Sequence, residues 1–219
     1  MKTIKMVFFD MDGTLIDSEY TYIYAWHELF KEYNIPIELV DILKWRGKSI
    51  HSINETINTF TNDMDATLNL RRLRDEIFYK KLINNQVELK PNALEILDFL
   101  DSKEIPYAIV TSTYKEKARC LLTHFNIMHR FKFIVYGDDV KDSKPAPDIY
   151  LKSLAISGYK KEEIVIFEDS ENGIRAANNA GIDVIYVIDR EKIDTSELRL
   201  TTIVNDFNEG IHYLSRYII

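Results

Sequence analysis

The sequence predicts an α/β fold, in which helices cover a parallel sheet and a helical region is inserted after the first strand. Two short runs, at residues 6–9 and 164–167, are continuously apolar, which is typical of strands buried on both faces. After residue 90, strand-like and helix-like segments alternate. The first two strand-like runs are too far apart for one crossover, which indicates an insertion.

Each expected element is marked by its own composition. Five β-rich runs should form the sheet: 4–9, 107–111, 133–136, 164–167 and 184–188. Four segments show helical patterns: 93–102, 115–125, 148–157 and 172–180. Gly181 follows the last of them, where glycine commonly ends a helix. Such alternation predicts right-handed crossovers between the strands.

The insertion runs from residue 18 to residue 88. Its helical stretches are rich in Leu, Ile, Tyr and Phe, and it contains no convincing strand. Pro91 marks the return to the main domain, because proline is favoured just inside a helix start. We therefore expect a core domain of residues 1–17 and 89–219 and a helical cap domain of residues 18–88.

Composition disfavours two classes of partner. The 219 residues include 28 Lys and Arg against 35 Asp and Glu, a net charge of −7, which disfavours nucleic acid and anionic membranes. The single cysteine, Cys120, allows no internal disulfide and is expected to pack in the core. No apolar run is long enough to span a bilayer, and no signal-peptide pattern is present. We expect a cytoplasmic protein, either a monomer or a weak dimer.

Polar residues gather where the predicted strands end, at the edge where open α/β sheets bind ligands. They are Asp10, Asp12, Thr111, Ser112, Lys144, Glu168 and Asp169. Asp10 and Asp12 project to the same side of an extended backbone, so one can attack phosphorus while the other manages a proton. The remaining carboxylates suit Mg²⁺, which prefers oxygen ligands. Lys144 would offset their charge, and Thr111 would bind phosphate oxygens.

These residues resemble the four signature motifs of the haloacid dehalogenase superfamily. The motifs here are DMDGT at residues 10–14, Thr111, KPAPD at residues 144–148, and Glu168-Asp169-Ser170 with Gly173 and Ala176-Ala177. The segments FFDMDGTLIDSE and KPAPDIY are most similar to the β-phosphoglucomutase-like branch. The resemblance covers nearly the whole chain and implies a doubly wound sheet in the order 3-2-1-4-5.

The resemblance also implies a role for each matched position. Asp10 would be the nucleophile that forms an aspartyl-phosphate, and Asp12 the general acid and base that also lends a backbone carbonyl to the metal. Thr111 and Lys144 would hold the phosphoryl group, with Ser112 beside them. Glu168 and Asp169 would serve Mg²⁺ together with Asp10 and Asp12. Dehalogenation is disfavoured, because dehalogenases lack the second aspartate.

These roles indicate a magnesium-dependent phosphatase acting on a small phosphorylated metabolite such as a sugar phosphate. The alternative is a β-phosphoglucomutase, which interconverts β-glucose 1-phosphate and glucose 6-phosphate. Mutases carry a histidine in the first cap helix where this chain has Tyr22, and an arginine near position 50 where it has Ile50. A phosphorylated receiver domain is disfavoured by length and by the cap. A catalytically dead binding protein is disfavoured because both aspartates are present.

Several of these residues also have a plainer interpretation. Lys144 could be a solvated lysine, although Pro145 and Pro147 stiffen its loop. Glu168 and Asp169 could simply cap the helix that follows, which is compatible with metal binding. Arg46 and Lys48 could contact the substrate or form an ordinary turn between cap helices.

Overall fold

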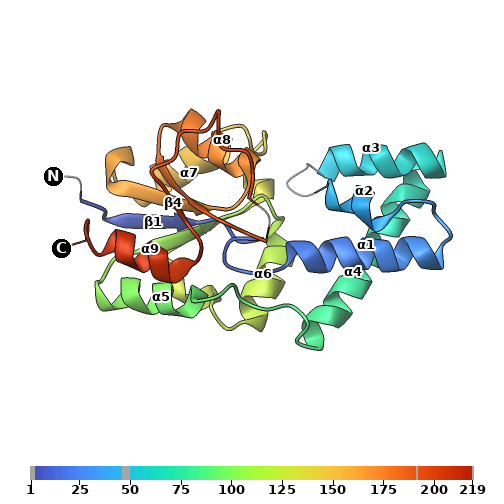
Figure 1. Cartoon of the computed structure of the whole chain (residues 1–219), viewed down its shortest axis with the longest axis horizontal. Helices are drawn as coiled ribbons and strands as arrows, with labels where there is room; N and C mark the ends of the chain where they lie inside the picture. Colours follow the sequence, from blue (N-terminus) through green and yellow to red (C-terminus); the bar gives the residue numbers. More distant parts are fainter. Residues whose placement is uncertain (1–2, 46–49, 191, 219) are drawn as a thin grey trace. The chain divides into compact units, whose positions relative to one another are not determined.

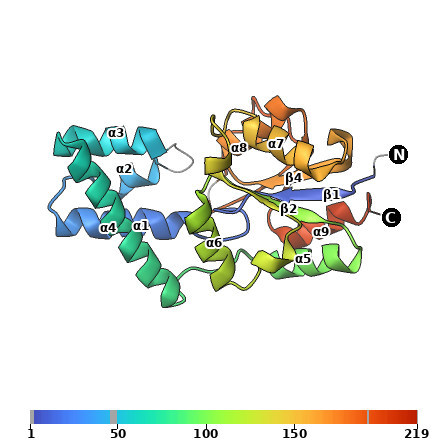
Figure 2. The same ribbon diagram turned by 180° about the vertical axis from the view of Figure 1, so that it is seen from behind.

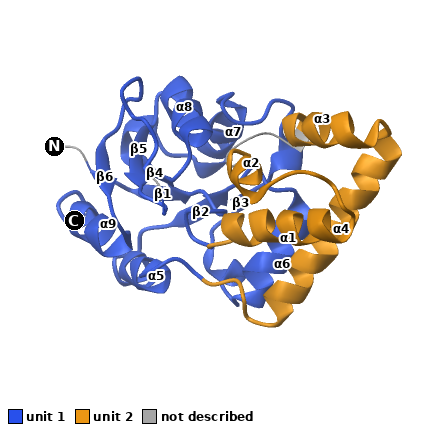
Figure 3. Ribbon diagram, turned by 45° about the vertical axis from the view of Figure 1, so that its right-hand side comes forward, with its two compact units in different colours: residues 1–16, 89–219 blue, residues 17–88 orange. Residues whose placement is uncertain are grey.

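The computed structural model describes residues 3–45, 50–190 and 192–218 (Figure 1). It divides into two compact units, drawn in different colours in Figure 3. Unit 1 comprises residues 1–16 and 89–219, and unit 2 comprises residues 17–88. Each unit has a hydrophobic cluster of its own. Among the described residues, no helix has the length and hydropathy that crossing a bilayer requires.

Unit 1 is built on a six-stranded parallel sheet with the order β3-β2-β1-β4-β5-β6. The strands are β1 (Met6–Phe9), β2 (Tyr107–Val110), β3 (Ile134–Val135), β4 (Ile164–Glu168), β5 (Asp183–Val187) and β6 (Thr202–Val204). All five neighbouring pairs run parallel. The structure therefore confirms the predicted fold class and the order 3-2-1-4-5, and it adds β6 at the edge.

Helices cover both faces of this sheet. They are α5 (Ala93–Ser102), α6 (Lys115–His124), α7 (Asp148–Ser157), α8 (Glu171–Ala180) and α9 (Phe207–Leu214). Single 3-10 turns lie at η1 (Met128–Arg130), η2 (Gly137–Asp139) and η3 (Lys161–Glu163). Figures 1 and 2 show α7 and α8 on one face and α5, α6 and α9 on the other. Right-handed crossovers require this split, since the chain moves outward from β1 to β3 and then returns past β1 to β4 and β5.

Alternation along the central strands divides the core between the two faces. Phe8 belongs to the cluster that includes Tyr150 and Ile174 from α7 and α8. Phe9 points the other way, stacks on Phe167 with ring centroids 5.2 Å apart and meets Phe207 of α9. Both phenylalanines of β1 are fully buried, and burying each such side chain contributes roughly 1.5–3 kcal/mol. β1 is thereby held at the centre of the sheet.

The described residues of unit 2 form four helices: α1 (Glu19–Glu32), α2 (Leu39–Leu43), α3 (Ile50–Thr61) and α4 (Met64–Ile83). The rings of Trp26, Phe30 and Trp45 form the centre of its core, with centroids 5.1–6.0 Å apart. Arg74 of α4 is buried, and its guanidinium lies 4.8 Å from the centroid of the Tyr22 ring and 4.9 Å from the Trp26 ring. The aromatic surface of α1 therefore stabilises a buried cation as well as the packing.

The prediction that Cys120 packs in the core is wrong. Cys120 is exposed on α6, because the buried face of this helix presents Ala118, Leu121 and Leu122, and position 120 is turned away from it. Pro91 lies two residues after the chain re-enters unit 1 at Leu89, and α5 begins at the predicted Ala93, after Asn92 in a left-handed conformation. The helix end at Gly181 is confirmed by its φ of +72°.

Candidate active site

The carboxyl ends of β1, β2 and β4 bring the candidate residues to one edge of the sheet. The hydrogen-bond ladder continues one residue beyond the strands, because Asp10 N donates to Phe167 O at 3.0 Å and Thr111 N donates to Val135 O at 3.1 Å. Both residues are buried, at 7% and 1% exposure. Backbone hydrogen bonds therefore fix the position of Asp10, the candidate nucleophile, independently of its side-chain contacts.

Lys144 is the cation at this edge. Its Nζ donates to Asp10 Oδ1 at 2.5 Å, to Glu168 Oε1 at 2.6 Å and to Val110 O at 3.2 Å. It also lies 5.1 Å from the centroid of the Tyr150 ring. The side chain is 6% exposed, so the interpretation as a solvated surface lysine is wrong. The three oxygen acceptors use all three ammonium hydrogens.

Glu168 is completely buried and holds five hydrogen bonds. Oε1 accepts from Lys144 and from Tyr150 OH at 2.9 Å. Oε2 accepts from Asp169 N, from Ser170 N and from Ser170 Oγ at 3.0–3.2 Å. Ser170 Oγ in turn accepts from Gly173 N and caps α8. The carboxylate is thus fixed between Lys144 and the start of α8, where the helix dipole also favours negative charge.

Asp169 is held against the turn that follows β1. Thr14 Oγ1 donates to Asp169 Oδ1 at 2.8 Å, and both residues are buried. Gly13 adopts a φ of +82°, and a Cβ at this position would come within 2.3 Å of Asp169 Oδ2. Glycine is required here by the backbone conformation and by the close carboxylate.

Asp10, Glu168 and Asp169 form a group that fits a divalent cation. One oxygen from each of the three buried carboxylates lies within 4.8 Å of the others. With all three carboxyl groups ionised, the single charge of Lys144 would leave an excess of two negative charges in a buried place. A doubly charged ion would neutralise this excess, and a set of oxygen ligands suits Mg²⁺. The side chain of Asp12 lies outside this group, so any contribution from Asp12 would come through its backbone.

Burial dominates the ionisation of this site. It raises the pKa of Asp10 well above the usual range, against the opposing effect of the Lys144 charge. Burial alone would lower the pKa of Lys144, but Asp10 and Glu168 outweigh it and hold that pKa well above the ordinary value. Lys144 therefore stays charged, whereas Asp10 needs compensating positive charge to act as an anion.

Asp12 points toward the loop after β2. Thr113 Oγ1 donates to Asp12 Oδ2 at 2.7 Å. Burial lowers the pKa of Lys117 on α6 to about 8, and the negative charge of Asp12 acts in the opposite direction. Asp12 is half-buried, unlike Asp10, so its carboxyl group lies where a reacting group could approach.

The structure brings together most of the residues that the sequence singled out. Asp10, Lys144, Glu168 and Asp169 share one cluster, and Thr111 lies buried at the same edge. Ser112 is exposed in the same loop, and its carbonyl lies so close to Gly137 that a Cβ there would come within 2.0 Å. Arg46 and Lys48 fall outside the described residues, so their contact with a substrate stays a prediction.

Three further residues contribute to this edge without having been predicted from the sequence: Thr14, Thr113 and Tyr150. Thr14 is the last residue of the DMDGT motif, and Tyr150 closes the KPAPDIY segment. Both could have been identified from these segments. Thr14 follows Asp12 within a tight turn, and Tyr150 follows Lys144 within a distance of one or two helical turns. Thr113 carries no such signal, because its contact with Asp12 depends on how two separate loops fold.

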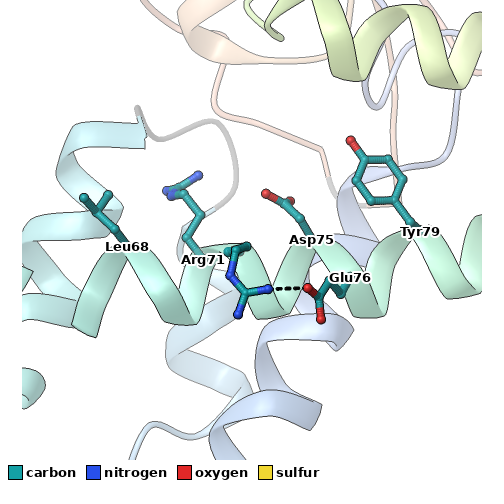
Figure 4. A pocket seen from close by; sticks show the side chains of 6 residues that line it. Leu68, Arg71, Asp75, Glu76 and Tyr79 are labelled. Carbon is teal, nitrogen blue, oxygen red and sulfur yellow. Dashed lines mark hydrogen bonds and ion pairs between the residues drawn. The ribbon is translucent and has the colours of Figure 1, made fainter. Parts of the chain in front are cut away.

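A second polar site lies on α4 of unit 2. A shallow hollow of about 320 Å³ is lined by Leu68, Arg71, Arg72, Asp75, Glu76 and Tyr79 (Figure 4). Arg72 pairs with Glu76, Asp75 pairs with Arg74 at 3.2 Å, and Arg71 donates to Asn54 Oδ1 at 2.9 Å. All lining residues come from one helix. The hollow lacks the convergent carboxylates and lysine of the unit 1 site.

Comparisons with known proteins agree with this geometry. Residues 7–187 match the family model of the haloacid dehalogenase-like hydrolases. The chain is 31% identical to a phosphorylated carbohydrates phosphatase of Thermotoga maritima over 193 residues, 84% of each chain. It is also 31% identical to the fructose-1-phosphate phosphatase YqaB of Escherichia coli, over 82% of this chain and 94% of that one. A crystal structure from Thermotoga maritima, provisionally named a β-phosphoglucomutase, superposes with a TM-score of 0.81 at 28% identity and covers 99% of this chain and all of that one.

Proposed function

We propose that this chain, which belongs to the haloacid dehalogenase-like hydrolases, is a phosphatase that hydrolyses small phosphorylated carbohydrates through a phosphorylated Asp10. The observation that carries the proposal is the buried triad of Asp10, Lys144 and Glu168 at the carboxyl edge of the sheet. The names of two relatives, a phosphorylated carbohydrates phosphatase and a fructose-1-phosphate phosphatase, support the substrate class.

In the first step, Asp10 attacks the phosphorus atom. Lys144 Nζ donates a hydrogen bond to Asp10 Oδ1, so Oδ2 is the oxygen that attacks. The new bond joins Oδ2 to phosphorus, while the bond from phosphorus to the sugar oxygen breaks. The departing oxygen keeps the electron pair and takes a proton from the Asp12 carboxyl group.

In the second step, water releases the phosphate. Asp12, now a carboxylate, accepts a proton from the water whose oxygen attacks phosphorus. The bond between phosphorus and Asp10 breaks and restores the carboxylate. The charge of Lys144 would offset the negative charge of the phosphoryl group, and the backbone N–H groups near Thr111 and Ser112 would bind the phosphoryl oxygens throughout.

Mg²⁺ would be held by Asp10 and Asp169, with the backbone carbonyl of Asp12 and with Glu168 close by. The bound ion would supply positive charge for the phosphoryl oxygens. The protein supplies the fixed positions: Thr14 orients Asp169, and Tyr150 and Ser170 orient Glu168.

The direct test is release of inorganic phosphate from a panel of sugar phosphates, with fructose 1-phosphate among them, by purified protein in Mg²⁺. We expect turnover that EDTA removes and that Mg²⁺ restores better than Ca²⁺, since longer Ca²⁺ bonds would misplace the phosphate. Turnover that survives thorough chelation would contradict the metal assignment. No phosphate release from any sugar phosphate would contradict the substrate class.

The mutase remains a second candidate, because a structure with that provisional name superposes on nearly the whole chain. β-Glucose 1-phosphate with a trace of the 1,6-bisphosphate separates the two activities. We expect free phosphate and little glucose 6-phosphate. Rapid, stoichiometric formation of glucose 6-phosphate would show that the mutase is the main activity.

A further inference from the structure

Tyr150 is held in the core beside the site by the helix that carries it. It is the third residue of α7, which begins at Asp148, and it is fully buried. Its side chain belongs to the same hydrophobic cluster as Phe8 of β1 and Ile174 of α8. Close packing against the sheet and a neighbouring helix leaves the ring little room to move. The fold therefore fixes the position of the Tyr150 hydroxyl group.

This one side chain contacts both partners of the buried ion pair between Lys144 and Glu168. The hydroxyl group of Tyr150 donates to Glu168 Oε1 at 2.9 Å. The centroid of its ring lies 5.1 Å from Lys144 Nζ, within the distance at which an aromatic ring attracts a cation. A tyrosine supplies both contacts at this position, whereas a phenylalanine would supply only the ring.

The two oxygens of Glu168 are anchored from different sides. Oε2 accepts from Asp169 N, Ser170 N and Ser170 Oγ, all in the segment that leads into α8. Oε1 accepts from Lys144 and from Tyr150. The hydrogen bond from Tyr150 thus locates Oε1 independently of Lys144. Without it, Oε1 would be located by a hydrogen bond from the ammonium group whose own position it helps to set.

We propose that Tyr150 is a positioning residue for Lys144, an inference that rests on the phosphatase function proposed above. Its hydroxyl group anchors Glu168 Oε1 and its ring lies against the ammonium group, so Lys144 keeps its hydrogen bond to Asp10 Oδ1. The nucleophile is thereby held in one orientation. A misplacement of about 1 Å can cost on the order of 100-fold in rate, and we expect a smaller displacement to cost about 10-fold.

Tyr150→Phe isolates the hydroxyl group, because it keeps the ring and removes the donor. The probe is p-nitrophenyl phosphate in Mg²⁺, with protein in excess so that each substrate molecule reacts once. Release of p-nitrophenolate then reports the attack by Asp10, since this leaving group needs little proton donation. The maximal rate at saturating protein does not depend on the fraction of protein that is folded. The protein concentration that gives half of this rate does depend on it.

Tyr150→Phe should lower the maximal rate about 10-fold and keep the half-saturating protein concentration within about 2-fold of wild type. Tyr159→Phe is the matched control and should change neither value. Its ring packs against the same hydrophobic cluster and lies 5.3 Å from the ammonium group of a different lysine, Lys132. An unchanged maximal rate in Tyr150→Phe, or an equal loss in Tyr159→Phe, would overturn the proposal.

A structural measurement keeps this proposal distinct from the phosphatase function. Crystal structures of metal-free wild type and Tyr150→Phe should show Glu168 Oε1 and Lys144 Nζ displaced in the variant by up to about 1 Å, with α7 unchanged. Identical positions in the two structures would overturn the positioning role whatever the protein hydrolyses. A wild type that releases no p-nitrophenolate, together with a displaced Lys144 in the variant, would instead overturn the phosphatase and leave the contact established.

Discussion

At the scale of single residues, the site depends on charges that balance only as a group. Lys144 joins two buried carboxylates, and burial would raise the pKa of Asp10 still further without it. Breaking a buried ion pair by removing one partner costs about 3–5 kcal/mol, because the remaining charge keeps its desolvation penalty. Lys144 should therefore matter for folding as well as for chemistry.

Lys144→Met tests this claim. We expect its free energy of unfolding to fall by about 3 kcal/mol or more and its phosphatase activity to fall by at least 100-fold. Urea unfolding and kcat/KM for a sugar phosphate measure the two effects. Lys152→Met is the control, since the ammonium group of this half-buried lysine donates to Asp139 O near the surface, away from the triad, and its loss should leave both values near wild type. Wild-type stability in Lys144→Met would refute the role of the buried triad.

The residues that could be predicted are those whose chemistry is visible in a short motif. Asp10 and Lys144 each lie in a compact signature, and the structure brings them within hydrogen-bonding distance across 134 residues. Thr113 could not be predicted, because an isolated threonine in a loop has many uses and only the folded loops decide between them. The exposed Cys120 shows the same limit, since neighbouring apolar residues do not reveal which side of a helix is buried.

At the scale of elements, the start of α8 sets the position of Glu168. Gly173 lies in the first turn of this helix, and a Cβ there would come within 1.7 Å of Glu168 Oε1. In an exposed helix, replacing glycine by alanine gains about 1 kcal/mol. Here the overlap with a buried carboxylate outweighs that gain, because the five hydrogen bonds of Glu168 leave it nowhere to move.

Gly173→Ala should therefore lower both the melting temperature and the activity. We expect a loss of roughly 2 kcal/mol, from the overlap and from weakened hydrogen bonds to a buried charge. Differential scanning calorimetry and a phosphate-release assay give the two readouts. Gly158→Ala, at a φ of +74° with open space around it, should cost about 1 kcal/mol through backbone strain and leave kcat/KM unchanged. A Gly173→Ala protein more stable than wild type would contradict the packing argument.

The bounds of helices were predicted most accurately where the apolar periodicity and the residues that break a helix indicated the same start and end. α5 and α7 begin and end at the predicted residues, since each has a buried apolar face and clear flanking breaks. β6 was missed because its three residues are too few to show alternation. α9 was missed because it follows this unpredicted strand, although its buried face packs Phe207 against the central sheet.

At the scale of the whole molecule, the insertion leaves and re-enters unit 1 at one place. Ile16 and Leu89 form an antiparallel bridge, and Lys90 N donates to Leu15 O at 2.9 Å. Residues across such a bridge are about 5 Å apart, so a short turn can join them. Each unit has its own hydrophobic cluster, which predicts that unit 1 can fold without unit 2.

Replacing residues 17–88 by a four-residue Gly-Ser linker tests whether unit 1 carries out the chemistry and unit 2 selects the substrate. We expect a folded protein that binds Mg²⁺ and hydrolyses p-nitrophenyl phosphate but no longer discriminates among sugar phosphates, because all the groups that we propose to contact the phosphoryl group belong to unit 1. Circular dichroism and the substrate panel provide the readouts. Discrimination equal to that of the full chain would show that unit 2 does not select the substrate, and an unfolded protein would show that unit 1 depends on it.

The central claim is that Asp10 carries the phosphoryl group, and acid quenching during turnover tests it most directly. Wild type mixed with a sugar phosphate and Mg²⁺ should yield a phosphorylated peptide that contains Asp10. Asp10→Asn should yield neither this peptide nor inorganic phosphate, because an amide cannot form the acyl-phosphate, and its thermal unfolding should still show a folded protein. Asp98→Asn, at an exposed position, should behave as wild type. Phosphate release by a folded Asp10→Asn protein, or phosphate attached to a different residue in wild type, would contradict the account.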